Sequence, residues 1–197
     1  MKKLAVIFLI FFITGCSSFN LTDSIKKVKF NLVEVKSIKF CDVDFKDKKK
    51  LKDFSLGEIA KISASVIQGK FPGKVTFEVK AVNNSDKPDA FSFADVGIKS
   101  FPYTLYLYDK QVVTGNINNP VNFPAPGSSS TFEINADFDM VNMFRELGYE
   151  KLIETVLAIR AGDFADISAK ITSRPILNVP WGEYEFPEEI KLENKID

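Results

Sequence analysis

The chain has 197 residues, enough for one domain of ordinary size. Apolar residues make up 45% of it and charged residues 26%, which is typical of a globular protein and unlike a disordered one. Lys and Arg together number 26, as do Asp and Glu, so the chain lacks the positive field that favours nucleic-acid binding. It has no histidine, which removes the usual zinc ligand, the usual general base and any Ser-His or Cys-His nucleophile pair. We therefore expect a protein that is not an enzyme and has no catalytic residues, metal or cofactor.

Residues 1–15 have the pattern of a cleaved signal peptide. Two lysines precede an uninterrupted apolar run at 4–13, which is well short of the roughly 20 residues that a membrane-spanning helix needs. The run ends in Ile13-Thr14-Gly15-Cys16, an aliphatic residue, two small residues and a cysteine. This ending resembles the bacterial lipobox. The resemblance implies that the chain is cut before Cys16 and that the Cys16 thiol receives a diacylglyceryl group.

Residues 16–27 are predicted to form the lipidated N-terminus and a polar tether. Eleven extended residues reach about 35–40 Å, enough to hold a domain clear of the lipid headgroups. Two or three acyl chains hold a protein stably on a bilayer, whereas one does so only marginally. Ser17 follows the cysteine where an aspartate is associated with inner-membrane retention, so the outer membrane is favoured if the host has two membranes. The predicted location is the cell envelope, with the membrane as partner through the lipid anchor.

Residues 28–193 are predicted to form a single, mainly β domain. Apolar residues alternate with polar ones in many short segments separated by turns, which favours an antiparallel β-sandwich. In the first segment the alternation slips between Leu32 and Val33, which indicates a bulge in one long strand or a break between two strands. Helical spacing interrupts the pattern at about 140–160, with Gly148 as a joint, and predicts a helical insert.

A second helix is predicted after Ser55. Ser55 and Glu58 have the spacing of a capping box, and Gly69 is placed to end the helix. Its apolar face is predicted to contain Leu56, Ile59, Ala60, Ser63, Val66 and Ile67.

A lysine-rich segment precedes this helix. The favoured interpretation is a solvated loop, and the alternative is a contact with anionic lipid, where each lysine adds about 1 kcal/mol near the surface. The lysines concerned are Lys46, Lys48, Lys49, Lys50 and Lys52.

The order of turns and strands at 77–138 resembles the group-2 late embryogenesis abundant proteins, also called the WHy domain. The features are an Asn-rich turn at Asn83, the strand Tyr103–Tyr108, a glycine after the next strand (Gly115), and the turn Phe123-Pro124-Ala125-Pro126-Gly127-Ser128. The sequence departs from the family where the turn at Asn83 lacks its middle proline and where Asp109 replaces a glycine. The resemblance implies an immunoglobulin- or fibronectin-III-like sandwich with one or two appended helices. It also implies a non-enzymatic role in tolerance of desiccation or other stress, with envelope proteins as clients.

Two other functions remain open at this point. The chain could be an accessory lipoprotein of an envelope assembly or secretion machine, docking through a loop or the helical insert. Alternatively, its 19 phenylalanines could enclose a cavity for an apolar ligand, although such residues more often fill the core.

The remaining candidate residues are predicted to have structural roles. Cys41 is predicted to be an unreactive strand residue, and Trp181 is predicted to plug the core or a sheet edge. The pairs Asp42/Asp44, Asp137/Asp139 and Asp163/Asp166 are predicted to be solvated strand ends and caps.

Overall fold

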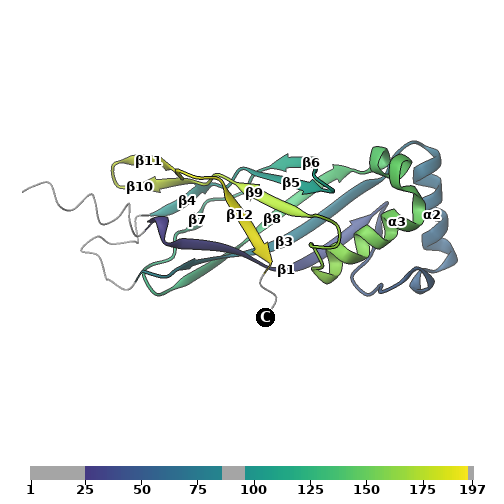
Figure 1. The fold of residues 1–197 in the computed structure, drawn as a ribbon, viewed down its shortest axis with the longest axis horizontal. Helices are drawn as coiled ribbons and strands as arrows, with labels where there is room; N and C mark the ends of the chain where they lie inside the picture. Colours follow the sequence, from purple (N-terminus) through teal and green to yellow (C-terminus); the bar gives the residue numbers. More distant parts are fainter. Residues whose placement is uncertain (1–24, 86–95, 195–197) are drawn as a thin grey trace, which may run out of the picture.

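The computed structural model describes residues 25–85 and 96–194 and is mainly β, as the sequence predicts (Figure 1). Its helical elements are the 3₁₀ helix η1 (Leu51–Asp53) and the α-helices α2 (Leu56–Ile67) and α3 (Val141–Ala161). Its strands are β1 (Val28–Phe40), β2 (Val43–Asp44), β3 (Pro72–Asn83), β4 (Gly97–Ser100), β5 (Tyr103–Leu107), β6 (Lys110–Gly115), β7 (Val121–Asn122), β8 (Ser129–Asp139), β9 (Lys170–Ser173), β10 (Ile176–Val179), β11 (Gly182–Glu185) and β12 (Ile190–Asn194).

The strands form a larger sheet in the order β6-β5-β9-β12-β1-β3-β8, with β2 beside β1, and a smaller sheet in the order β11-β10-β4-β7. Neighbours pair antiparallel, apart from β1 and β12, which pair parallel. The two ends of the larger sheet approach each other. The Tyr103 hydroxyl of β5 donates to the Asn135 carbonyl of β8 at 2.6 Å, and the Phe101 and Phe132 ring centroids lie 5.0 Å apart. This approach of opposite ends agrees with the predicted sandwich.

The longest strand follows the sequence prediction closely. β1 is one strand of 13 residues, and its register against β3 shifts between Leu32 and Glu34, where the alternation slips in the sequence. A second shift lies between Val35 and Ser37. The phase slip therefore marks a bulge, which lets one strand keep its apolar side chains on the core side along its whole length.

Phenylalanines fill the core at both ends of the β1–β3 ladder. At one end Phe40 contacts the rings of Phe45, Phe71 and Phe138 at centroid distances of 5.4–5.8 Å. At the other end Phe30 lies between the rings of Phe101 and Phe186, at 5.4 and 5.8 Å. Tilted and edge-on pairs of this kind suit the charge distribution of aromatic rings. The buried apolar residues form one core cluster.

Helix α2 begins and ends as predicted but presents a different face to the core. Ser55 accepts a hydrogen bond from the Glu58 amide, Glu58 accepts one from the Ser55 amide, and Gly69 has φ +73° after the last turn. The fully buried residue is Ile62, whereas Leu56 and Ile67, predicted to face inward, are each 86% exposed. The predicted face was wrong by about one residue, or ~100° of helix rotation. The reason is that α2 covers the end of the sheet with the side that carries Ile62, against which Ile59 and Val66 of the predicted face also pack.

Helix α3 is part of the core. Its second half buries Leu152, Ile153 and Val156, and Thr155 shares a hydrogen bond of 2.9 Å with the Tyr108 hydroxyl. Gly148 has φ +78° and ψ 172° inside the helix, so the predicted joint is present. The predicted insert at 140–160 is therefore an integral element that packs beside β1.

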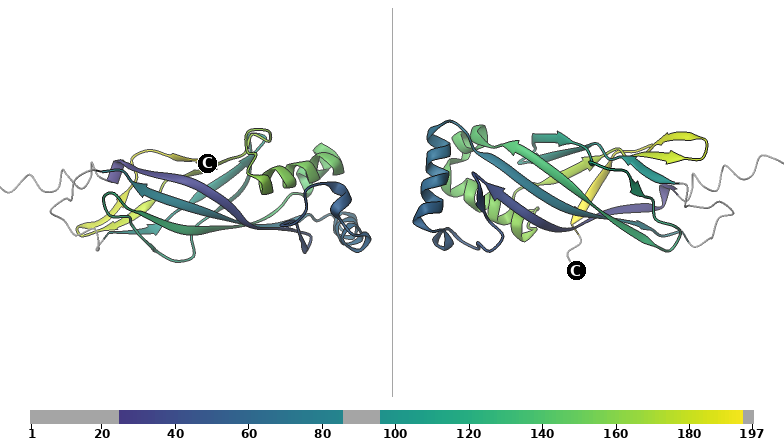
Figure 2. Two further views of the ribbon diagram at one scale, coloured as in Figure 1. Left: turned by 90° about the horizontal axis from the view of Figure 1, so that it is seen from below. Right: turned by 180° about the vertical axis from the view of Figure 1, so that it is seen from behind.

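The molecule is long, and its two ends differ (Figure 2). The first residues of β1 lie at one end, together with the β10–β11 hairpin, while α2 and the loop before it lie at the other. Because β1 runs most of this length, its start and its end are about 40 Å apart at ~3.3 Å per residue.

Candidate functional site

The predicted lipidation site, Cys16 with its flank Ile13, Thr14 and Gly15, lies outside the described residues. Within 25–85 and 96–194, no helix combines the length and apolar character needed to cross a bilayer. The other predicted site residues fall into two groups, the family-like turns and the lysine-rich loop.

Three of the turn residues come together around Asn83. Its buried side chain donates to the Pro124 carbonyl at 3.0 Å and accepts from the Ser85 amide at 3.1 Å. The backbone carbonyl of Asn83 accepts from the Gly127 amide at 2.9 Å, and its amide donates to the Ser128 carbonyl at 3.0 Å. Asn83 thus joins the end of β3 to the loop before β8. These turn residues therefore have a structural role, because their polar atoms form hydrogen bonds with one another and hold the two turns together.

Gly115 lies apart from that cluster, at the end of β6 opposite Tyr103. A Cβ atom added here would overlap the hydroxyl end of the Tyr103 ring. Tyr103 is itself buried and its hydroxyl is bonded to β8, so the ring cannot move aside. The glycine is needed because β5 and β8 are joined through this ring.

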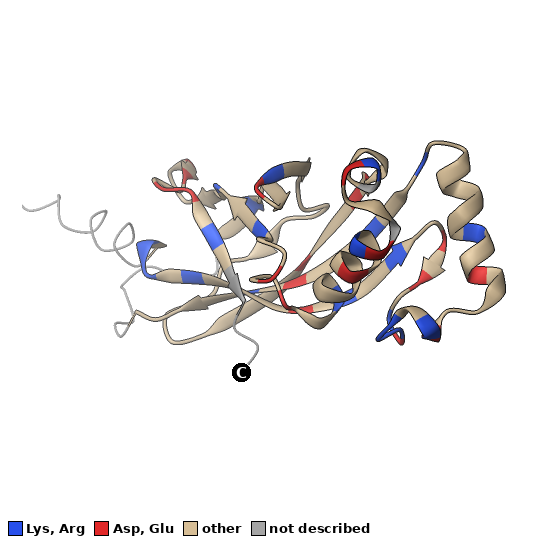
Figure 3. Cartoon of the chain, turned by 45° about the vertical axis from the view of Figure 1, so that its right-hand side comes forward, with Lys and Arg blue, Asp and Glu red and all other residues tan. Residues whose placement is uncertain are grey.

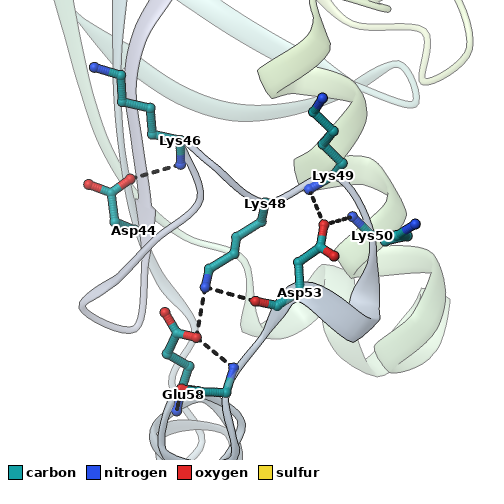
Figure 4. Close-up of polar contacts among 8 residues, drawn as sticks. Asp44, Lys46, Lys48, Lys49, Lys50, Asp53 and Glu58 are labelled. Carbon is teal, nitrogen blue, oxygen red and sulfur yellow. Dashed lines mark hydrogen bonds and ion pairs between the residues drawn. The ribbon is translucent and has the colours of Figure 1, made fainter.

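The lysine loop, residues 46–52, is an ordered turn that runs into η1 and is bonded to α2 through Lys48 (Figure 4). Lys48 turns inward: its ammonium donates to Glu58 at 2.8 Å and to the Asp53 carbonyl at 3.0 Å, and it lies 5.3 Å from the Phe54 ring centroid. The hydrogen bond from Lys48 is the largest of the effects that lower the Glu58 pKa to about 2. Lys48 is therefore a structural residue of the loop.

The other lysines of the loop differ from Lys48. The backbone amides of Lys49 and Lys50 donate to the Asp53 carboxylate at 2.9 and 3.1 Å, which lowers the Asp53 pKa. Lys46 is held through its backbone, whose carbonyl accepts from Arg160 at 2.6 Å. Among the described residues, no hydrogen bond or ion pair engages the ammonium groups of Lys46, Lys49, Lys50 and Lys52, and all four residues are exposed. The fixed backbone thus presents four exposed lysines to solvent, of which Lys50 and Lys52 also attract the Asp53 carboxylate.

The remaining candidates have structural roles. Asp139 accepts from the amides of Phe71 and Val141 at 3.0 and 2.8 Å, and Asp44 accepts from the Lys46 amide at 2.8 Å. In the described ranges, no three His, Cys, Asp or Glu residues gather as metal ligands would. Cys41 lies in the tight β1–β2 turn with φ +50°, not in a strand, and burial raises its thiol pKa. Trp181, predicted to be a plug, is 51% exposed.

A cavity lies between β1, β5 and the segment that follows α3. Its volume is about 70 Å³, and its lining includes Leu32, Leu105, Phe164, Ile171 and Leu192. Pockets for small-molecule ligands usually measure ~300–1,000 Å³. This cavity, which is lined by the neighbouring strands β5, β9, β12 and β1 and by the segment after α3, is smaller than that range.

No protein-family model and no curated protein matches this chain. Among solved structures, an Archaeoglobus fulgidus protein is similar at a TM-score of 0.33 and 18% identity, over 64% of this chain and 88% of its own. An Arabidopsis thaliana protein solved in solution is similar at a TM-score of 0.31 and 15% identity, over 64% of this chain and 74% of its own. Similarity at this level does not assign a family, and the resemblance to the WHy domain stays a prediction.

The Asn83 cluster generates a prediction of stability. Asn83→Ala removes the partners of the Pro124 carbonyl and the Ser85 amide, so we expect unfolding to become easier by about 2–4 kcal/mol in urea titrations. The matched control is Asn119→Ala, an exposed position where the change should stay within about 0.5 kcal/mol. Equal midpoints for the two variants would show that Asn83 does not hold the turns together.

The Lys48–Glu58 pair generates a prediction of pH dependence. Folding lowers the Glu58 pKa to about 2, so the ionised Glu58 carboxylate stabilises the folded state. That stabilisation is complete above the usual carboxyl pKa and is lost as pH falls from there towards 2. In Lys48→Met the folded pKa rises towards its usual value, so we expect a shallower loss of stability across that acid range. Urea unfolding at neutral and acid pH measures this, with Lys46→Met as control. An unchanged acid slope in Lys48→Met would contradict it.

Proposed function

We propose that this chain is a non-enzymatic lipoprotein, anchored in the cell envelope through lipid on Cys16, that protects envelope proteins or the membrane surface during desiccation or similar stress. The observation behind the proposal is the sequence Ile13-Thr14-Gly15-Cys16 directly after a short apolar run. Lipid at that position would confine the domain to a bilayer surface, where its function is contact with neighbouring molecules.

The outer face of the β1–β3–β8 ladder supports a protective role. Lys36 bridges Glu78 at 2.5 Å and Glu133 at 3.0 Å, and these hydrogen bonds raise the Lys36 pKa. Beside them, the Ser37 hydroxyl donates to Thr76 at 3.1 Å, and the Thr76 hydroxyl donates to the Asn135 side chain at 2.8 Å. Polar groups that satisfy one another keep their partners when water is withdrawn, and charge pairs strengthen as the dielectric constant falls. The domain is thus suited to remain folded while drying.

Other features favour this role over the alternatives. Hollows of about 70, 200 and 230 Å³ in the described part of the chain are each smaller than the ~300–1,000 Å³ usual for a small-molecule pocket, which argues against a carrier of an acyl chain. An accessory role in an envelope machine needs a docking element, which the sequence predicts to be a loop or the helical insert, and the insert, α3, buries Leu152 and Val156 in the core. Deleting that helix would open the core, so it is not a detachable arm. A protective function does not require a detachable docking element.

The anchor predicts where the protein is found. In envelope fractionation of the native host, the natural chain should sediment with membranes and carry added acyl mass, because two or three acyl chains hold it there. Cys16→Ala should lose both the acyl mass and processing before residue 16, and Cys41→Ala, a second thiol substitution, should behave as the natural chain. Natural and Cys16→Ala chains that are equally soluble and equally free of acyl mass would contradict the anchor.

Protection predicts survival of a client. An enzyme dried or freeze-thawed with the purified protein should retain more activity than with an inert globular protein of equal mass. The control is Phe77→Asp, which places a carboxylate at a position 1% exposed in the core and should unfold the domain. We expect protection to need the folded domain. Equal survival with the natural protein and the inert one would contradict the protective role.

A further inference from the structure

Large apolar side chains gather on the surface at one end of the molecule, the α2 end, which we define as residues 46–70. Four large hydrophobic residues are exposed in the described part of the chain: Leu51, Leu56, Ile67 and Trp181. The first three lie at the α2 end, and Leu56 and Ile67 are the most exposed of all, each at 86%. Exposed apolar side chains are common singly, but such a concentration marks a contact surface.

The outward face of α2 continues this surface. Leu56 and Ile67 are eleven residues apart, which places them on the same side of the helix and about 16 Å apart along it. Between them the exposed positions are small residues, Ala60, Ser63 and Ala64, with Lys61 at the margin. The helix thus presents a low apolar ridge with a large side chain at each end. Its capped ends and buried Ile62 hold that ridge in place.

The α2 end is also where positive charge concentrates. Residues 46–70 contain seven lysines and three acidic residues, whereas the whole chain balances 26 against 26. Figure 3 shows the blue segments of the loop beside α2. Lys48 is engaged by Glu58, whereas Lys49, Lys50 and Lys52 are exposed and flank Leu51, and Lys50 and Lys52 attract the Asp53 carboxylate at longer range. Exposed apolar side chains and exposed lysines therefore occur together at the α2 end.

We propose that the α2 end binds the surface of an anionic bilayer, with Leu51, Leu56 and Ile67 entering the interface and the flanking lysines contacting lipid phosphates. Lysines on flexible stems suit a fluid anionic surface, and an apolar ridge that protrudes suits the boundary between headgroups and acyl chains. A second copy of the chain fits less well, because two like-charged ends would oppose each other. The inference concerns residues 46–70 and does not depend on lipid at Cys16.

A tryptophan reporter tests the proposal directly. The chain has one tryptophan, so Trp181→Phe combined with Leu56→Trp places the only indole on α2. The full-length variant is mixed with vesicles of phosphatidylcholine alone or of phosphatidylcholine with phosphatidylglycerol. We expect the emission to shift to shorter wavelength with the anionic vesicles, and the shift to be lost at high salt, where lysine–phosphate attraction is screened. A reporter at the exposed position Gln111, made in the same background, should stay unchanged.

Matched charge variants separate specific docking from general attraction. Lys49→Gln/Lys50→Gln/Lys52→Gln should abolish the shift, while Lys27→Gln/Lys29→Gln/Lys191→Gln, which removes the same charge from exposed positions elsewhere, should preserve it. Equal loss in both variants, a shift independent of phosphatidylglycerol, or no shift would overturn the proposal. A change that follows protein concentration without vesicles would identify a second copy as the occupant instead. Vesicles are added from outside, so the shift does not require lipid on Cys16, and the two proposals can fail separately.

Discussion

The structure depends on β3, which pairs over nearly its whole length with β1 on one side and with β8 on the other. Its inward side chains, among them Val75, Phe77 and Val79, are almost completely buried, while Thr76 and Glu78 take part in the polar network outside. A slip of one residue in either register would exchange the two faces. Asn83 ends the strand by bonding the loop before β8, and Asp139 bonds the Phe71 amide beside its start. Both ends of the ladder are therefore fixed by side chains.

Much of this could be predicted from sequence because it depends on local order. The alternation in β1, β3 and β8, the slip at Leu32, the capping box at Ser55 and the joint at Gly148 each rest on neighbouring residues, and the structure confirms them. The sheet order could not be predicted, since β12 joins β1 in parallel from the far end of the chain. That pairing depends on packing between segments far apart in the chain, and the local alternation of apolar and polar residues does not record such packing.

The candidate site, too, could be predicted from sequence only in part. Counting lysines identified the loop, but sequence alone could not tell that Lys48 turns inward, because its partner Glu58 lies ten residues away on a helix that folds back over the loop. The orientation of α2 was wrong for a related reason. Its apolar residues extend around more than half of the helix, so periodicity alone allows several faces to be buried. The sheet end accepts Ile62, and this choice leaves Leu56 and Ile67 outside.

The start of β1 and the α2 end lie at opposite ends of a stiff sheet (Figure 1). In a protein held through its N-terminus on one membrane, α2 would reach up to about 40 Å beyond the start of β1, the length of that strand at ~3.3 Å per residue. With both attachments made at once, the domain would act as a spacer that sets the gap between two lipid surfaces. The hydrogen-bonded strands would resist compression of that gap. When drying draws two membranes together, the domain would therefore keep their surfaces apart.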